Sequence, residues 1–237
     1  MVTKRGSVVY FSLIFLSYVV GALVLITAFD LPGDLLTPTE QWSFFFGSLI
    51  ATVCFAGTFS LHWLRTLIHE LKHAVMVLLT GNRLRGIQVK SFTGQTHYDM
   101  YFDTLRFAPV ICLAPYFFPL FSLPVLLLCV FLELVGPLFE VIVLGIALGI
   151  DMVSAYGELH PNQSDLRKVA GGIYGAGLFI AGANYMWLAL SCLWVLAGKG
   201  GYVHMWKVIC RFVEIVAARM EGYFPAGWEK NLFDSFG

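Results

Sequence analysis

Long apolar segments, separated by short polar ones, dominate the pattern of the chain. The apolar runs extend over about residues 8–29, 42–79, 107–131, 134–155 and 166–197. Each run holds about 20 residues or more, which is the length at which an α-helix crosses the hydrocarbon core of a bilayer. The pattern therefore predicts an all-α membrane protein with about five transmembrane helices. No internal repeat or linker interrupts it, which favours a single domain over residues 1–237.

Residues 202–219 follow a different pattern, in which apolar and charged side chains alternate at helical spacing. Trp206 and Val213 fall on one side of such a helix, whereas Lys207, Arg211 and Glu214 fall on the other. This distribution is typical of an amphipathic helix that lies on a membrane surface, rather than of a sixth span.

Composition agrees with a multi-pass integral membrane protein. Hydrophobic residues make up 58% of the chain and charged residues only 13%, with a formal net charge of zero. A chain without net positive charge offers no basic surface for nucleic acid, so its expected surroundings are the lipid bilayer and a membrane-bound partner. The five cysteines are scattered and odd in number, which fits neither a disulfide framework nor a cysteine zinc site.

The basic residues predict an orientation in the membrane. Lys4 and Arg5 precede the first span, the segment 80–106 is rich in Arg and Lys, and Arg167 and Lys168 lie between the fourth and fifth spans. Because basic residues accumulate in cytoplasmic loops, we expect the N-terminus and both of these segments on the cytoplasmic side.

The second apolar run contains the sequence His69-Glu70-Leu71-Lys72-His73, which matches the pattern H-E-x-x-H. On a helix, residues four apart share a face, so His69 and His73 can present imidazole nitrogens to one metal ion while Glu70 reaches a water molecule beside it. Neutral imidazole suits Zn²⁺, and a catalytic zinc site keeps one position open for water. The pattern therefore predicts a hydrolytic zinc site.

A third protein ligand must come from elsewhere on the same side of the membrane. We favour Asp165, because His69 lies about six residues after the apolar stretch that ends at Trp63, and Asp165 lies about six residues before the apolar stretch that starts at Gly171, which predicts a similar depth for both. Ser164 is expected to cap the fifth helix, which would fix Asp165 in its first turn. Asp151 and His160 are the alternatives.

A rival interpretation is an ion or metal transporter, or a metal-binding membrane protein without proteolytic activity. Its ion path would use His62, His69, Glu70, His73, Glu140 and Asp151. Ionisable groups at membrane depth are costly and normally face a partner, a cavity or an ion. A path needs polar residues across the full membrane thickness, whereas this cluster is confined to the cytoplasmic side with only Glu140 deeper, so the pattern favours a metal site.

Taken together, these motifs resemble a known family. The H-E-x-x-H helix is followed by a basic segment with Gly86 and Gly94, a proline-rich span with "LAPYFFP", and then a cytoplasm-side aspartate. Over about residues 60–190 the sequence resembles the site-2 protease family of intramembrane zinc metalloproteases, in particular its small bacterial-type members.

The resemblance implies one zinc ion per chain, held by His69, His73 and Asp165, with Glu70 as the general base. It also implies cleavage of a membrane-spanning or membrane-adjacent peptide bond. The chain departs from the family at two places. Better-known members carry Leu-Asp-Gly around the aspartate, whereas this chain has Ser164-Asp165-Leu166. Lys72 occupies a position where a glycine is common in the family.

Residues 85–102 combine β-branched and polar residues around Gly94, which indicates a short hairpin directly after the H-E-x-x-H helix. A helical substrate must unwind before its peptide bond is accessible, and an edge strand can hold it extended. We therefore expect Gly94, Gln95 and Thr96 to contact the substrate.

Overall fold

The computed structural model describes residues 4–58, 62–90, 93–132, 136–157, 159–160 and 163–220. In chain order its elements are α1 (Lys4–Phe29), η1 (Gly33–Leu35), α2 (Glu40–Thr58), α3 (His62–Leu79), β1 (Arg83–Val89), β2 (Gly94–Asp99), η2 (Phe102–Phe107), α4 (Ala108–Phe117), α5 (Ser122–Leu132), α6 (Pro137–Tyr156), α7 (Ser164–Arg167) and α8 (Gly172–Met220).

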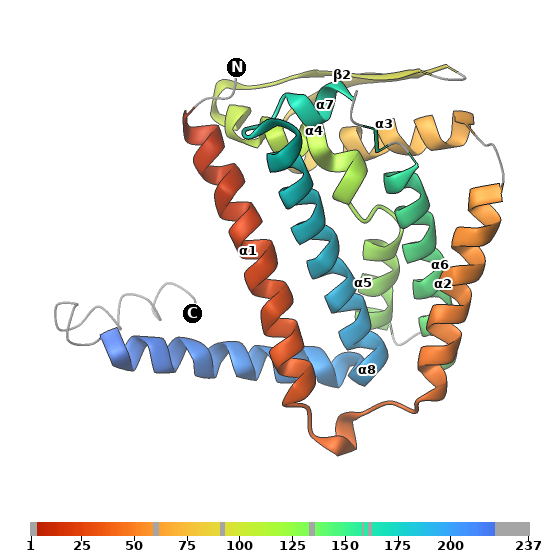
Figure 1. The fold of residues 1–237 in the computed structure, drawn as a ribbon, viewed down its shortest axis with the longest axis vertical. Helices are drawn as coiled ribbons and strands as arrows, with labels where there is room; N and C mark the ends of the chain where they lie inside the picture. The colour runs from red at the N-terminus through yellow and green to blue at the C-terminus, as the bar shows by residue number, and fades with distance from the viewer. Residues whose placement is uncertain are drawn as a thin grey trace.

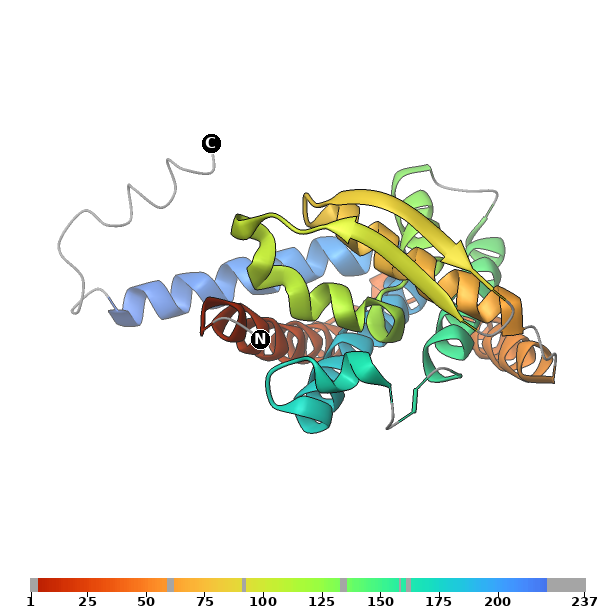
Figure 2. The same ribbon diagram turned by 90° about the horizontal axis from the view of Figure 1, so that it is seen from above.

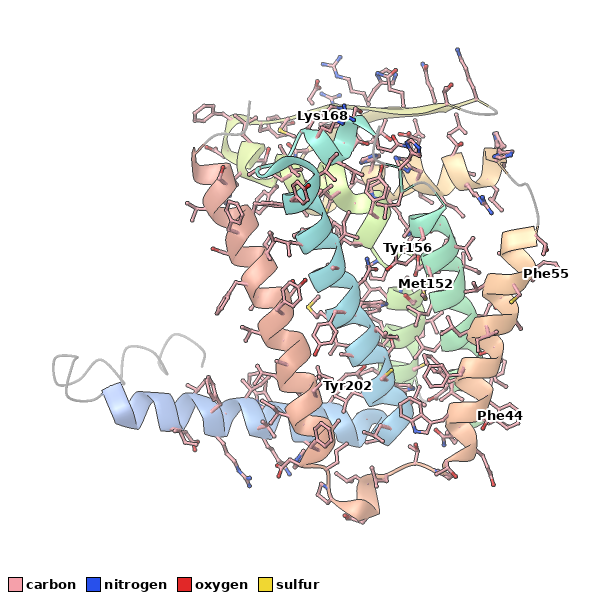
Figure 3. The ribbon with its side chains drawn as sticks, viewed as in Figure 1. Phe44, Phe55, Met152, Tyr156, Lys168 and Tyr202 are labelled. Atoms are coloured by element: carbon pink, nitrogen blue, oxygen red, sulfur yellow. The ribbon has the colours of Figure 1, made fainter. Side chains whose placement is uncertain are left out.

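A bundle of roughly parallel helices forms the body of the protein, and the other elements lie across its two ends. Helices α1, α2, α5, α6 and the first part of α8 run along the bundle (Figure 1). Helix α3, the β1–β2 hairpin and α7 gather at the end where α1 begins, and the second part of α8 lies across the other end (Figures 1 and 2). Lys168 and Tyr202 mark the two ends (Figure 3).

Apolar packing joins the helices of the bundle. Tyr10 of α1 stacks on Phe179 of α8, with ring centroids 5.3 Å apart. On the other side of the bundle, α2 packs closely against α6, because a Cβ atom at Gly149 would lie 2.9 Å from the Cβ atom of Thr52. Small residues at such contacts let helices approach in a membrane, where apolar burial alone does not drive association.

The structure agrees with an all-α membrane protein but does not confirm five spans. Among the described residues, three helical segments are long and apolar enough to cross a membrane: Ser7–Phe29, Pro137–Tyr156 and Gly172–Ile215. A fourth results if Phe102–Phe117 and Ser122–Phe131, which are bent by 86°, form one broken span. The break lies in the expected span 107–131, where Pro119 cannot continue the helix.

The expected continuous span 42–79 is wrong. Helix α2 ends at Thr58, and α3 starts at His62 and runs across the end of the bundle instead of along it (Figure 1). Charged and imidazole side chains are costly in hydrocarbon. A helix that lies across the end of the bundle keeps its H-E-x-x-H sequence at that end and away from the middle of the bundle (Figure 1).

Two further helix boundaries differ from the expectation. Residues 166–197 do not form one helix: α7 ends at Arg167, and positive φ is adopted by Gly171 (80°), which precedes α8, and by Gly172 (57°), its first residue. The predicted amphipathic helix 202–219 is the second part of α8, which extends to Met220 after a break at Gly198 with φ of 52°. Glycine tolerates positive φ at little cost, so the chain turns at these points.

The predicted hairpin is present. Strands β1 and β2 pair antiparallel, with Val89 opposite Gly94 and Arg83 opposite Asp99. Gly94 begins β2 rather than forming the turn, which is closed by a hydrogen bond of 2.8 Å from the Lys90 N–H to the Thr93 carbonyl. The hairpin lies over α3, with β2 between β1 and α4 (Figure 2).

Candidate metal centre

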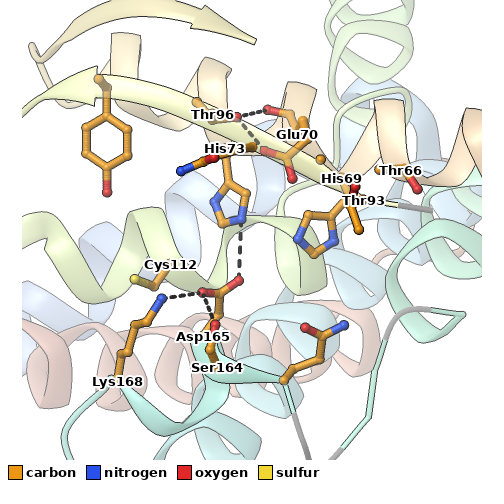
Figure 4. Close-up of a pocket in the computed structure, with 14 residues that line it drawn as sticks. Thr66, His69, Glu70, His73, Thr93, Thr96, Cys112, Ser164, Asp165 and Lys168 are labelled. Atoms are coloured by element: carbon orange, nitrogen blue, oxygen red, sulfur yellow. Dashed lines mark hydrogen bonds and ion pairs between the residues drawn. The ribbon is translucent and has the colours of Figure 1, made fainter. Parts of the chain in front are cut away.

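A cavity of about 540 Å³ lies between the hairpin, α3, α4 and α7 (Figure 4). Most of its lining side chains are polar. They are Thr66, His69, Glu70, His73, Thr93, Gly94, Gln95, Thr96, Tyr98, Cys112, Gln163, Ser164, Asp165 and Lys168. All seven residues expected from the sequence to bind metal, act as base or contact substrate therefore line one cavity.

The helical spacing of His69 and His73 brings their rings together. The ring centroids lie 5.0 Å apart at an interplanar angle of 70°. His73 is oriented by α4, since its Nδ1 lies 2.8 Å from the carbonyl oxygen of Ile111. The Nδ1 atom of His69 is buried and has no hydrogen-bond partner in the described structure, and the ring meets Tyr116 edge-on at 5.7 Å between centroids.

Asp165 approaches the two histidines from α7. Its Oδ2 lies 3.6 Å from Nε2 of His73. His69, His73 and Asp165 each offer one ligand atom, and these three atoms lie within 4.8 Å of one another. Lys168 holds the other carboxylate oxygen, with Nζ 3.2 Å from Oδ1. Ser164 is the first residue of α7 rather than its cap, which is Gln163.

The two alternative third ligands lie elsewhere. Neither Asp151 nor His160 is among the described residues that line the cavity. Asp151 projects from α6 toward Lys72 and the start of α5, where its Oδ2 accepts a hydrogen bond of 2.8 Å from the Ser122 N–H. The carboxylate that accompanies the histidine pair is thus Asp165.

The protonation states suit a metal-binding cluster. Burial, together with the nearby His73 and Lys72, lowers the pKa of His69 to about 4, although Asp165 opposes the shift. Burial raises the pKa of Asp165, but hydrogen bonds and charge interactions with His73 and Lys168 outweigh it and lower the value to about 2. Near neutral pH, His69 is therefore uncharged and Asp165 is ionised, which are the forms that bind a cation.

The arrangement of His73 and Asp165 suits a shared cation. A neutral His73 that donates its Nδ1–H to Ile111 presents a lone pair at Nε2, opposite the carboxylate of Asp165. The lone pairs of the imidazole nitrogen and of the carboxylate oxygen repel each other, and a proton or a metal cation between the two atoms removes this repulsion. An Nδ1–H bound to a backbone carbonyl is also the usual arrangement for a histidine that ligates metal through Nε2.

Glu70 faces the hairpin. Its side chain is buried, and Oε2 lies 2.7 Å from Oγ1 of Thr96, which is also 3.1 Å from the Glu70 carbonyl oxygen. Gly94 passes so close that a Cβ atom there would lie 2.7 Å from Oε1 of Glu70 and even closer to its Cγ. The start of β2 thereby fixes the position of the carboxylate.

Comparison with known proteins agrees with this geometry. Residues 47–156 match the family model described as Peptidase M50B-like. Over this segment the chain is similar to the site-2 protease family. The match includes His69, Glu70 and His73 and ends before Asp165. No curated protein and no solved structure matches the chain. This similarity indicates a membrane metallopeptidase, and site-2 proteases typically depend on zinc.

Two contributors to the site were missed from the sequence. The Ile111 carbonyl orients His73, but a backbone acceptor has no residue signature. Lys168 could have been found, because it follows Asp165 at the i,i+3 spacing of neighbours on one helix face.

Proposed function

We propose that the protein is an intramembrane zinc endopeptidase that cleaves membrane-spanning or membrane-adjacent peptide bonds near the cytoplasmic face. The observation that carries the proposal is the cluster of His69, His73 and Asp165 beside Glu70 in one cavity. Two imidazoles and one carboxylate form a donor set suited to a catalytic zinc ion, which needs three protein ligands and one open position.

In this proposal, His69, His73 and Asp165 hold one zinc ion. When bound, zinc supplies a Lewis acid that polarises the scissile carbonyl and activates water. The residues fit such an ion, because His69 has an unpartnered buried nitrogen and His73 faces a carboxylate across 3.6 Å.

Glu70 is the proposed general base. It accepts a proton from the attacking water molecule and passes it to the nitrogen of the leaving amine. Thr96 donates a hydrogen bond to Oε2, which leaves Oε1 for the proton transfer and keeps the carboxylate in one orientation. A base held in this way needs no reorganisation before the reaction.

The hairpin is the proposed substrate platform. Lys90 and Thr93 form a hydrogen-bonded pair, and in an antiparallel ladder hydrogen-bonded and non-hydrogen-bonded pairs alternate. Gly94 and Thr96 therefore belong to non-hydrogen-bonded pairs, and their backbone N–H and C=O groups point away from β1. This free edge of β2 lies on the side of α4 and borders the cavity. An extended substrate strand can pair with it, in contact with Gly94, Gln95 and Thr96.

The transporter alternative has less support. It requires Asp151 to belong to an ion path, yet the Asp151 carboxylate is paired with Lys72 and accepts hydrogen bonds from the start of α5. The polar cluster at one end of the bundle favours a site over a path.

The proposal is tested by metal analysis and proteolysis of the parent protein and a Glu70→Gln variant, using a model single-span substrate. We expect one zinc ion per chain in both proteins. Cleavage should fall by roughly 10²–10⁴-fold in the variant, the usual contribution of a general base. Unchanged proteolysis by Glu70→Gln, or a parent without zinc, contradicts the proposal.

A further inference from the structure

The helix that carries the histidines also carries a buried lysine. The side chain of Lys72 is 1% exposed, and its Nζ lies 2.9 Å from Oγ of Ser154 and 3.4 Å from Oδ1 of Asp151, both on α6. Burying a cation and a carboxylate costs free energy even when they are paired, so such a pair is weak evidence for stability by itself. The role of the Lys72–Asp151 pair therefore has to follow from the elements that it connects.

Asp151 connects this lysine to α5, the second helix of the bent α4–α5 pair. Its Oδ2 accepts hydrogen bonds from the Ser122 N–H at 2.8 Å, the Ser122 Oγ at 2.7 Å and the Phe121 N–H at 3.1 Å. These groups belong to the start of α5, where backbone N–H groups lack partners in the helix and favour an anion. The Ser122 Oγ in turn accepts a hydrogen bond of 2.7 Å from Trp187 of α8.

The two halves of the bent α4–α5 pair thus contact α3, directly or through Asp151, at the adjacent residues His73 and Lys72. The first half, α4, receives the Nδ1–H of His73 at the Ile111 carbonyl. The second half, α5, reaches Lys72 through the carboxylate of Asp151. Two attachments on different sides of one helix restrict both its rotation and its translation, and each histidine of the cluster depends on that placement.

We propose that Lys72 and Asp151 are positioning residues of the metal centre, which hold α3 at the rotation and depth that bring His69 and His73 to Asp165. This inference rests on the proposed zinc site and goes beyond it, since neither residue is among the described residues that line the cavity. The pair serves the geometry of the site more than the stability of the fold.

The test separates these two roles with a double variant. Lys72→Met with Asp151→Asn removes both charges while nearly preserving shape, and it leaves an amide that can still accept hydrogen bonds from Ser122 and Phe121. Removing both members of a buried ion pair leaves no unpaired charge, which is the state that destabilises strongly. Ser154→Ala is a milder variant, because it removes one hydrogen-bond acceptor of Lys72 and leaves the charge pair in place. Lys207→Met, at an exposed lysine in the second part of α8, is the matched control.

Zinc affinity is measured by chelator competition, and site geometry by the visible absorption of the Co²⁺-loaded protein. For the double variant we expect a folded protein with a thermal midpoint close to that of the parent. Its zinc affinity should be about 10–100-fold weaker, as for loss of groups that orient metal ligands, and its Co²⁺ spectrum should change. Ser154→Ala should change zinc affinity and the Co²⁺ spectrum in the same direction as the double variant, but by a smaller amount. Lys207→Met should change neither of them.

A folded double variant with the zinc affinity and Co²⁺ spectrum of the parent overturns the inference and leaves the proposed function intact. If the double variant does not fold, the same result for Ser154→Ala overturns it. A parent protein that binds no zinc contradicts the proposed function, and the inference with it.

Discussion

Asp165 reaches the histidine pair through a very short element, and its neighbour explains how it is held there. Leu166 is buried among side chains of α1, α4 and α8, whereas Asp165 points from the same turn into the cavity. The apolar contact of Leu166 anchors α7, and Lys168 fixes one carboxylate oxygen of Asp165. A leucine after the aspartate therefore has a packing role that a glycine could not perform.

Substitution of Asp165 tests the third ligand. Asp165→Asn keeps the size of the side chain but removes its charge, so we expect zinc affinity to fall by more than about 10²-fold, since loss of an outer partner alone costs about 10–100-fold. Chelator competition measures the change. His160→Ala, outside the described lining of the cavity, is the control and should retain the affinity of the parent. Full zinc affinity in Asp165→Asn would move the third ligand to another residue.

At the scale of elements, the contact between β2 and α3 determines where the base lies. Gly94→Ala would place a methyl group against the Glu70 side chain, which must then move. Displacement of a catalytic group by about 1 Å can cost on the order of 10²-fold in rate, so we expect a loss of that order in kcat with zinc retained.

Gly86→Ala on β1 is the matched control for this prediction. A Cβ atom at Gly86 would meet nothing within 4 Å, so this variant should cleave a model substrate at the rate of the parent. Equal rates for Gly94→Ala and Gly86→Ala would show that β2 does not position the base.

The sequence predicted these elements to different degrees. The H-E-x-x-H helix and the hairpin follow from local patterns, because helical spacing and the alternation around Gly94 concern neighbouring residues. The direction of α3 does not follow from a local pattern, because apolar content alone cannot distinguish a helix along the bundle from a helix across its end. The contacts of Lys72 with Asp151 and of His73 with Ile111 join residues far apart in sequence, so no local pattern indicates them.

At the scale of the whole molecule, the candidate site and the second part of α8 lie at opposite ends of the bundle (Figure 1). The first end carries the start of α1 and the basic hairpin, which we expect in the cytoplasm. The other end carries a helix with Lys207 and Arg211 exposed on one side and Trp206 exposed on another, as expected for a helix at the opposite membrane surface.

Labelling from the two sides of the membrane tests this orientation. In a protein with its native cysteines replaced, a cysteine at position 103 (Asp103→Cys, in η2) should react with an impermeant maleimide from the cytoplasmic side only. A cysteine at position 211 (Arg211→Cys, in α8) should react from the opposite side only. Both native residues are exposed, so neither label needs the protein to open. Reaction of both from one side would contradict the predicted topology.

The position of the site along the bundle predicts where substrates are cut. His69, His73 and Asp165 lie on elements at the end of the bundle where α1 begins (Figure 1). Because the basic residues predict that this end is cytoplasmic, we expect a substrate helix in the same bilayer to present its cytoplasmic end to them. Water reaches this end by the shorter path, and the free edge of β2 lies at the same level to hold an unwound strand.

We therefore expect cleavage near the cytoplasmic end of a single-span substrate, where Gly, Pro or Asn lets its helix unwind. Mass spectrometry of the two products locates the cut. Replacing the helix-breaking residues by a Leu/Ala run should suppress cleavage, because unwinding then costs more free energy, whereas the same run placed at the outer end of the substrate should not. A cut at the middle of the bilayer, or equal cleavage of both stiffened substrates, would refute the placement of the site at the cytoplasmic end.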